Sequence, residues 1–164
     1  MKALLFGTTL LCLLASPAQA QLRKVNDISL AAASKLADTA MAACQAQGRH
    51  IVVTVLDRGG NIVAVQRADG VGPHNTDASR RKAYTALSTK NDTQALAVAA
   101  RDNPDMANLT TVPELLLLGG GLPLRAKGDI VGAIGVAGGG GALPDRACAL
   151  AALAAVPELD SPTL

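Results

Sequence analysis

The chain has 164 residues, a formal net charge of +2 and almost no aromatic side chains, with one Tyr, one Phe and no Trp. Proteins that hold nucleic acids or anionic membrane surfaces do so with basic patches and stacking aromatics, so this composition argues against both classes. A core made mainly of Ala, Val, Leu and Ile buries little area per side chain, so association with further copies would add stability.

The first twenty residues resemble a secretory signal peptide. Lys2 supplies a positive start, an apolar stretch follows over residues 3–15, and Ala18-Gln19-Ala20 matches a cleavage site. The apolar stretch is too short to span a bilayer comfortably. We therefore predict export to the periplasm or the medium with cleavage after Ala20, no membrane attachment after cleavage, one domain over residues 21–157, and a frayed tail over residues 158–164.

Two cysteines, Cys44 and Cys148, remain in the predicted mature chain. An even pair in an exported protein is typical of a disulfide. Two cysteines this far apart in sequence could equally be small buried residues on separate helices. The sequence leaves both alternatives open, because it does not give the separation of the two Cα atoms.

Hydrophobic periodicity predicts the elements of the first half of the chain. A helix is expected over residues 27–47, with Gly48 as its stop, followed by strands over residues 50–56 and 62–67. The Gly59-Gly60 pair between these strands is typical of a hairpin turn. After a loop over residues 68–76, helices are expected over residues 77–89 and from Asp92 or Thr93 to Arg101.

The second half predicts another hairpin and a final helix. We expect its strands at the apolar runs 115–118 and 130–137, with an irregular segment ending in Lys127-Gly128-Asp129 between them. Gly132 and Gly135 inside the second run would let a helix or another backbone approach closely. Four glycines, residues 138–141, precede a helix over residues 144–156. Hairpins with apolar helices at both ends indicate an α+β domain around an antiparallel sheet.

Five segments in this order resemble the GlcG/HbpS family, the haem-binding or haem-degrading family that also includes the C-terminal domain of PduO-type proteins. The resemblance extends over residues 27–156. It rests on Val55–Ala64, Arg67–Gly70, Ala78–Ala86, Gly119–Pro123, and Gly132–Val136 followed by Asp145.

This resemblance implies a profilin-like fold, a central antiparallel sheet of about five strands flanked by helices. It also implies homo-oligomers, from dimers to octamers, and haem or a related tetrapyrrole as ligand. The chain contains no Cys-x-x-Cys-His motif, so any haem would be bound non-covalently.

Side chains able to ligate haem iron are few, and His74, His50 and Tyr84 are the candidates. His74 lies in the Pro- and Gly-containing loop, whereas His50 begins the first strand. Tyr84 follows Arg80-Arg81-Lys82, and Arg81 is a candidate partner for a haem propionate. Each residue also has a structural interpretation: two ordinary surface histidines, and a half-buried tyrosine beside a solvated basic face.

The resemblance also implies a pocket in which Asp69 and Gly120 contact a ligand, with small residues of the Gly138–Gly141 loop as its floor against the loop that carries Asp69. The Gly138–Gly141 loop could alternatively be only a tight turn from strand to helix. No Ser-His-Asp arrangement, metalloprotease motif or nucleotide-binding motif is present. Two alternatives to haem binding stay open: an enzyme acting on a small hydroxy acid or aldehyde at Asp69, and an accessory partner of a dehydrogenase.

Overall fold

A computed structural model describes residues 21–161. The predicted signal peptide, residues 1–20, and the last residues, 162–164, lie outside the described residues. One antiparallel sheet has the order β2-β1-β4-β3, formed by β1 (Val52–Asp57), β2 (Ile62–Arg67), β3 (Gly121–Ala126) and β4 (Asp129–Ala137). The α+β class and the antiparallel sheet are confirmed, with four strands instead of about five.

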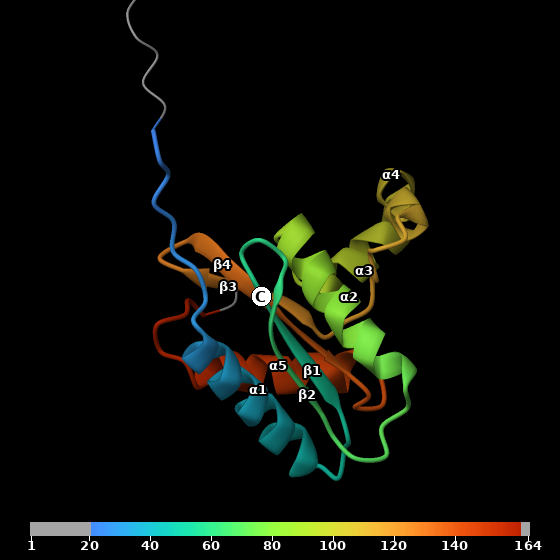
Figure 1. Ribbon diagram of the computed structural model, residues 1–164. Coiled ribbons are helices and arrows are strands. Elements are labelled where there is room, and N and C mark those ends of the chain that lie inside the picture. Colours follow the sequence, from blue (N-terminus) through green and yellow to red (C-terminus); the bar gives the residue numbers. More distant parts are fainter. Residues whose placement is uncertain (1–20, 162–164) are drawn as a thin grey trace, which may run out of the picture.

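Two helices, α1 (Leu30–Gln45) and α5 (Ala142–Ala154), lie side by side on one face of the sheet (Figure 1). Their contact surfaces are mostly Ala, so the two helix axes can approach closely, and Leu36 and Val53 fill the space beneath them. A disulfide joins Cys44 in α1 to Cys148 in α5, with their Cα atoms 5.6 Å apart. The question that the sequence left open is thereby settled in favour of the disulfide.

The other face of the sheet carries α2 (His74–Thr89), which contacts β4, β1 and β3. Gly135 of β4 lies directly beneath this helix, where a Cβ atom would collide with the carbonyl oxygen of Ser79. The expectation that a missing Cβ admits a helix at this point is confirmed. Thr54 of β1 and Ser79 of α2 share a buried hydrogen bond of 2.7 Å across the same interface.

The second hairpin differs from its prediction, because its first strand is Gly121–Ala126 and not the apolar run 115–118. Pro123 is compatible with a strand here because β3 is an edge strand. Lys127 and Gly128, both with positive φ, form the tight turn to β4. In the apolar run 115–118, backbone groups form hydrogen bonds with side chains instead of with a strand; for example, the Leu116 amide donates to Thr85 Oγ1 at 2.8 Å.

Helix starts also differ from the predicted ones by a few residues. Helix α1 begins at Leu30 and not at residue 27, because Ser29 caps it and its hydroxyl accepts from the Ala32 amide at 3.2 Å. The Asp27 carboxylate instead accepts from the Arg58 amide in the β1–β2 turn at 2.9 Å. Helix α2 begins three residues earlier than expected, at His74.

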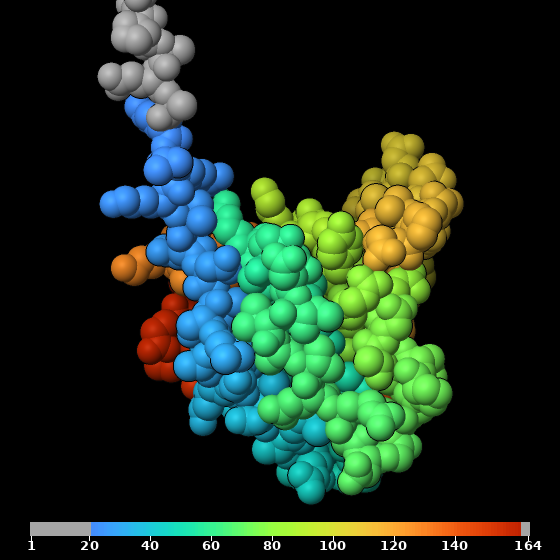
Figure 2. All heavy atoms as spheres, viewed as in Figure 1, coloured from blue at the N-terminus to red at the C-terminus, as the bar shows by residue number. Residues whose placement is uncertain are grey.

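Beyond α2, the chain forms α3 (Thr93–Asp102), α4 (Pro104–Ala107) and the 3-10 helix η1 (Asn108–Thr111). Asp92 caps α3, as the sequence predicts, accepting from the Gln94 amide at 2.8 Å. The segment around α4 projects from the body of the molecule (Figures 1 and 2). Within residues 21–161, no helix is long and apolar enough to cross a membrane.

The start of the predicted frayed tail is docked against the hairpin turn between β3 and β4. The carboxylate of Asp160 accepts from the amides of Lys127 and Gly128, at 3.0 and 2.7 Å. Leu159 packs against the apolar core cluster. Two contacts therefore hold residues 159 and 160 in place. Leu159 packs on the core, and Asp160 supplies the acceptors that the amides of Lys127 and Gly128 need.

Candidate functional site

Three glycine-containing connections meet at one end of the sheet and border a shallow hollow that is open to solvent. They follow α1, β2 and β4, and Figure 1 shows all three at the lower end of the sheet. We call this hollow, about 350 Å³ in volume, the glycine cleft; it is lined by Gly48, Arg49, His50, Gly70, Val71, Gly72, Asn75, Gly138, Gly139 and Gly140. The loop carrying Asp69 and the loop after β4 therefore face one another, as the sequence suggested.

A second hollow of about 290 Å³ adjoins the glycine cleft and shares Gly48, Arg49 and His50 with it. Its other lining residues include Met41 and Ile51, which supply an apolar wall. His50 and Arg49 thus stand between the two hollows. Together the hollows are of the size that small ligands occupy in proteins.

The ring of His50 is oriented by a hydrogen bond to the main chain. Its Nδ1 lies 3.0 Å from the carbonyl oxygen of Asp69, and the side chain is exposed. A carbonyl oxygen can only accept, so Nδ1 carries the proton and the neutral ring has its lone pair on Nε2. Metal-ligating histidines in proteins are held in this way, with the second ring nitrogen donating to a carbonyl or carboxylate.

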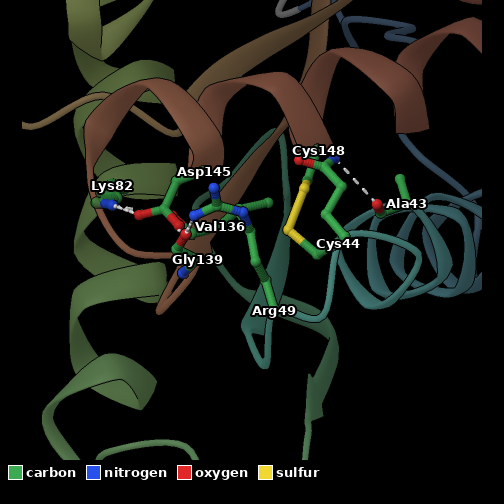
Figure 3. Close-up of a disulfide and its surroundings, with 9 residues drawn as sticks. Ala43, Cys44, Arg49, Lys82, Val136, Gly139, Asp145 and Cys148 are labelled. Carbon is green, nitrogen blue, oxygen red and sulfur yellow. Dashed lines mark hydrogen bonds and ion pairs between the residues drawn. A yellow bond between two sulfur atoms is a disulfide. The ribbon is translucent and has the colours of Figure 1, made fainter.

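Arg49, directly before His50, reaches across the glycine cleft to its opposite wall. Its Nη1 donates to the carbonyl oxygen of Gly139 (Figure 3). Its Nε is buried without a hydrogen-bond partner within the part of the chain that the structure describes. The guanidinium therefore brings a positive charge, held by its bond to Gly139, to the cleft.

A buried ion pair supports the wall that Arg49 reaches. Nζ of Lys82 in α2 lies 2.6 Å from Oδ2 of Asp145 in α5, and these side chains are 1% and 4% exposed. The second oxygen, Oδ1 of Asp145, accepts from the Gly139 amide at 2.7 Å, and Lys82 Nζ also donates to the Val136 carbonyl at 3.0 Å. Figure 3 shows these groups converging beside the disulfide.

Burial lowers the pKa of Lys82 below its ordinary value, and the negative charge and hydrogen bond of Asp145 offset part of that effect. The pair resists being opened, because either charge left alone in this environment would lack a partner. The wall of the cleft formed by Gly139 is consequently attached to both α2 and α5.

The six residues expected to contact a ligand are not gathered in one place. Asp69 is exposed at the second hollow, beside the glycine cleft, and its main-chain carbonyl meets the ring of His50. His74, the exposed first residue of α2, lies beside the cleft, where a Cβ atom on Gly72 would come within 3.1 Å of its ring. These two residues and His50 share one end of the sheet.

Tyr84, Arg81 and Gly120 lie elsewhere. The ring of Tyr84 covers the β1–β2 turn, 3.7 Å from a Cβ built on Gly60, about 20 Å along the strand from the cleft. Arg81 donates to the carbonyl oxygen of Leu115 at 2.7 Å. Gly120 is buried with a φ of +118°, and a Cβ on it would lie 3.2 Å from Lys82 Nζ, so this glycine admits the ion pair.

Three functional features are not apparent from the sequence. Arg49 has no spacing signal, and Lys82 belongs to a run of three basic residues that is typical of a solvated helix face. Asp145 is of a type that bonds the local backbone in turns, which it does, but its partner Lys82 is 63 residues away in sequence. Among residues 21–161, no three His, Cys, Asp or Glu side chains gather as metal ligands.

Comparison with known families gives one match over most of the chain. The family described as haem degrading protein HbpS-like matches residues 28–154. A 15.0 kDa protein encoded between dhaT and dhaS in Citrobacter freundii is 34% identical over 71% of this chain and 84% of its own length. Protein GlcG of Escherichia coli K12 is 33% identical over 52% of this chain and 63% of its own length.

Solved structures agree with these matches in sequence and in fold. A double mutant of HbpS from Streptomyces reticuli is 39% identical, with a TM-score of 0.77 over 87% of this chain and 97% of that one. ORFY of Klebsiella pneumoniae is 30% identical, with a TM-score of 0.80 over 87% and 99%. A PduOC:heme complex, 22% identical with a TM-score of 0.74 over 84% and 99%, shares the fold. The chain belongs to the HbpS-like family.

Proposed function

We propose that this protein is an exported, oligomeric haem-binding protein in which His50 ligates the iron from the glycine cleft. The observation that carries the proposal is the hydrogen bond between His50 Nδ1 and the Asp69 carbonyl, which leaves Nε2 as a free, oriented ligand. Membership of a family described as haem degrading, and the haem complex of a protein with the same fold, support this choice of ligand.

The residues around His50 fit a non-covalently bound tetrapyrrole. Met41 offers an apolar contact in the second hollow, the buried side chains of Ile51 and Val71 line the two hollows, and Arg49 offers a cation within reach of a propionate carboxylate. Haem would supply a redox-active iron, and His50 would supply one axial nitrogen. Because the hollows are open to solvent, the bound group would exchange with free haem.

Two further parts of the proposal have their own support. Export is consistent with the Cys44–Cys148 disulfide, because such bonds persist in oxidising compartments. Self-association is supported by the face of β2 that α2 leaves uncovered, where Ile62 and Val65 are 55% and 42% exposed. Light scattering of the mature protein, residues 21–164, tests the second point, and fractionation of expressing cells tests the first.

The central experiment is a titration of the oxidised mature protein with haemin, followed through the Soret band. We expect a saturable shift with one haem per chain or per dimer. His50→Ala should abolish the shifted band, because the iron loses its axial nitrogen. His74→Ala and Tyr84→Phe serve as matched controls, since His74 only borders the cleft and Tyr84 lies at the other end of the strand.

A titration without saturation would overturn the proposed function and would direct attention to small hydroxy acids and aldehydes as ligands. A saturable shift that survives His50→Ala but disappears with His74→Ala or Tyr84→Phe would instead overturn the choice of His50. A shift that survives all three substitutions would exclude the whole set of ligands named here.

A further inference from the structure

We infer that Asp145 is a positioning residue for the cleft: its Oδ1 fixes Gly139, Gly139 fixes Arg49, and Arg49 in turn holds His50 in place for the ligand. The inference rests on the proposed function and names the residues outside the cleft on which ligand binding at that site depends. Lys82 serves the same purpose by holding the second carboxylate oxygen of Asp145.

The geometry forms an unbroken sequence of contacts from the helices to the cleft. Asp145 Oδ1 accepts from the amide of Gly139 at 2.7 Å, and the carbonyl of the same glycine accepts from Arg49 Nη1. Both polar groups of this one residue are therefore used, one on each side of the loop. Rotation of the backbone at Gly139 would break both bonds at once.

Because residue 139 is a glycine within a run of glycines, the position of this loop depends on the hydrogen bonds of Gly139 to Asp145 and Arg49. A Cβ atom there would lie 2.7 Å from Asp145 Oδ1 and 3.5 Å from Cys44 Sγ, so the loop is in direct contact with the carboxylate and the disulfide. The flanking residues Gly138, Gly140 and Gly141 all have positive φ. A run of glycines has little conformational preference of its own, so its position depends on external hydrogen bonds.

On the opposite side of the cleft, Arg49 is anchored at both its ends. Its main-chain amide donates to the carbonyl of Cys44 at 3.0 Å, and its guanidinium holds Gly139. His50 follows immediately, with its ring bonded to Asp69. If Gly139 were released, the guanidinium would lose its acceptor and the spacing between the two walls of the cleft would no longer be fixed.

Two double variants separate the positioning role from the charge of the ion pair. Lys82→Met with Asp145→Asn removes both charges but keeps an oxygen that can accept from Gly139. Lys82→Met with Asp145→Leu removes the charges and the acceptor, with a side chain of similar size. Both avoid an unpaired buried charge, which is the change that would destabilise the protein most.

We expect the Asn variant to bind haemin within about threefold of the wild type, and the Leu variant to bind at least about tenfold more weakly, with a broadened Soret band. Circular dichroism at the temperature of the titration, together with thermal unfolding curves, establishes that both variants are folded. Equal haemin affinities in the two folded variants would overturn the positioning role.

A second measurement does not need haem. Hydrogen exchange of the Gly139 amide and the NMR signal of Arg49 Nε–H, recorded without ligand, should match the wild type in the Asn variant. In the Leu variant we expect the Gly139 amide to exchange at least about tenfold faster. Unchanged exchange would overturn the inference, whereas faster exchange in a protein that binds no haemin would leave this loop geometry standing and remove only the proposed function.

Discussion

The two faces of the sheet are held by different physical means. On the face covered by α1 and α5, the core cluster is apolar and is reinforced by the Cys44–Cys148 disulfide. The buried charge of α5, Asp145 near its start, pairs with Lys82 of α2. On the face covered by α2, the buried residues include Thr54, Ser79 and Lys82, each with a hydrogen-bond partner. The first face depends mainly on filling its volume with apolar side chains, whereas the second requires particular partners in particular places.

This difference separates stability from specificity within one small domain. Apolar packing is non-directional and depends on area, so it favours compactness without defining the direction of a loop. Buried hydrogen bonds are directional and costly to leave unmade, so they define where each group lies. The glycine cleft is attached to the polar network through Gly139, and its geometry follows from that network.

The largest effect is expected from removing one partner of the ion pair. Lys82→Met leaves the Asp145 carboxylate buried without its cation, which should lower the free energy of unfolding by about 3–5 kcal/mol. Adding Asp145→Asn removes the uncompensated charge and should recover most of that loss. Urea denaturation of the single and double variants measures the difference, and equal stabilities would show that the pair is not tightly coupled.

Loss of the disulfide tests the apolar face. Cys44→Ala with Cys148→Ala should lower the free energy of unfolding by about 2–5 kcal/mol, since the bond closes a loop with a sequence separation of 104. Cys44 Sγ touches the Gly139 loop, but the hydrogen bonds of Gly139 go to Asp145 and Arg49 and not to sulfur, so the affinity for haemin should change by less than about threefold. Reduction of the wild-type protein with a thiol provides an independent control, and a large loss of affinity at unchanged fold would contradict this separation.

Exchanging side chains between the faces sharpens the comparison further. Val53→Thr places a hydroxyl among apolar side chains under α1 and should cost about 2 kcal/mol. Thr54→Val, the neighbouring position on the α2 face, loses one hydrogen bond to Ser79 and should cost about 1 kcal/mol. Thermal unfolding ranks the two, and the reverse order would contradict the assignment of the faces.

The smallest expected effect depends on pH. Burial alone would raise the pKa of Asp57, but hydrogen bonds from Asn61, Gly59 and Gly60 outweigh it and lower the pKa below 3.8. The carboxylate therefore adds stability above pH 3.8, and this contribution disappears as the pH falls through the lowered pKa.

Asp57→Asn should cost less than about 1 kcal/mol at neutral pH and nothing once the wild-type carboxyl is protonated. Urea denaturation at neutral pH and at successive acidic values measures the difference between the two proteins. A difference that stays constant with pH would contradict the role of the charge. Asp129→Asn, in an exposed position at the start of β4, is a matched control.

The fold was largely predictable because its periodic signals are local. The short apolar runs of β1 and β2, the Gly59-Gly60 turn and the Ala-rich helix faces each depend on neighbours in sequence. The run over residues 115–118 misled the prediction because its apolar composition is typical of a strand. Its backbone forms hydrogen bonds with the side chains of Thr85 and Arg81 in α2 and Thr93 in α3. These helices are distant in sequence, so no local pattern reveals that the run is irregular.

The candidate site was predictable only in part, for the same reason. The glycine loop, His50 and Asp69 are residue types with recognisable local roles, and they do meet at one end of the sheet. The pairing of Lys82 with Asp145 joins two helices that are distant in sequence, and no periodicity encodes it. Tyr84 was predicted as a site residue because a tyrosine can ligate haem iron. It lies well along α2 from His74, and its ring contacts the β1–β2 turn at the other end of the sheet.

The contact between α1 and α5 has a consequence for how the chain folds. The first helix of the domain has its apolar face covered by the last one, so the contact order is high and α1 cannot complete its burial until α5 is available. During synthesis from the N-terminus, the alanine face of α1 and Cys44 would stay exposed until the sheet has formed and α5 has been synthesised. Correct pairing of Cys44 is therefore a late event, and oxidation before α5 arrives would favour mispaired, intermolecular products.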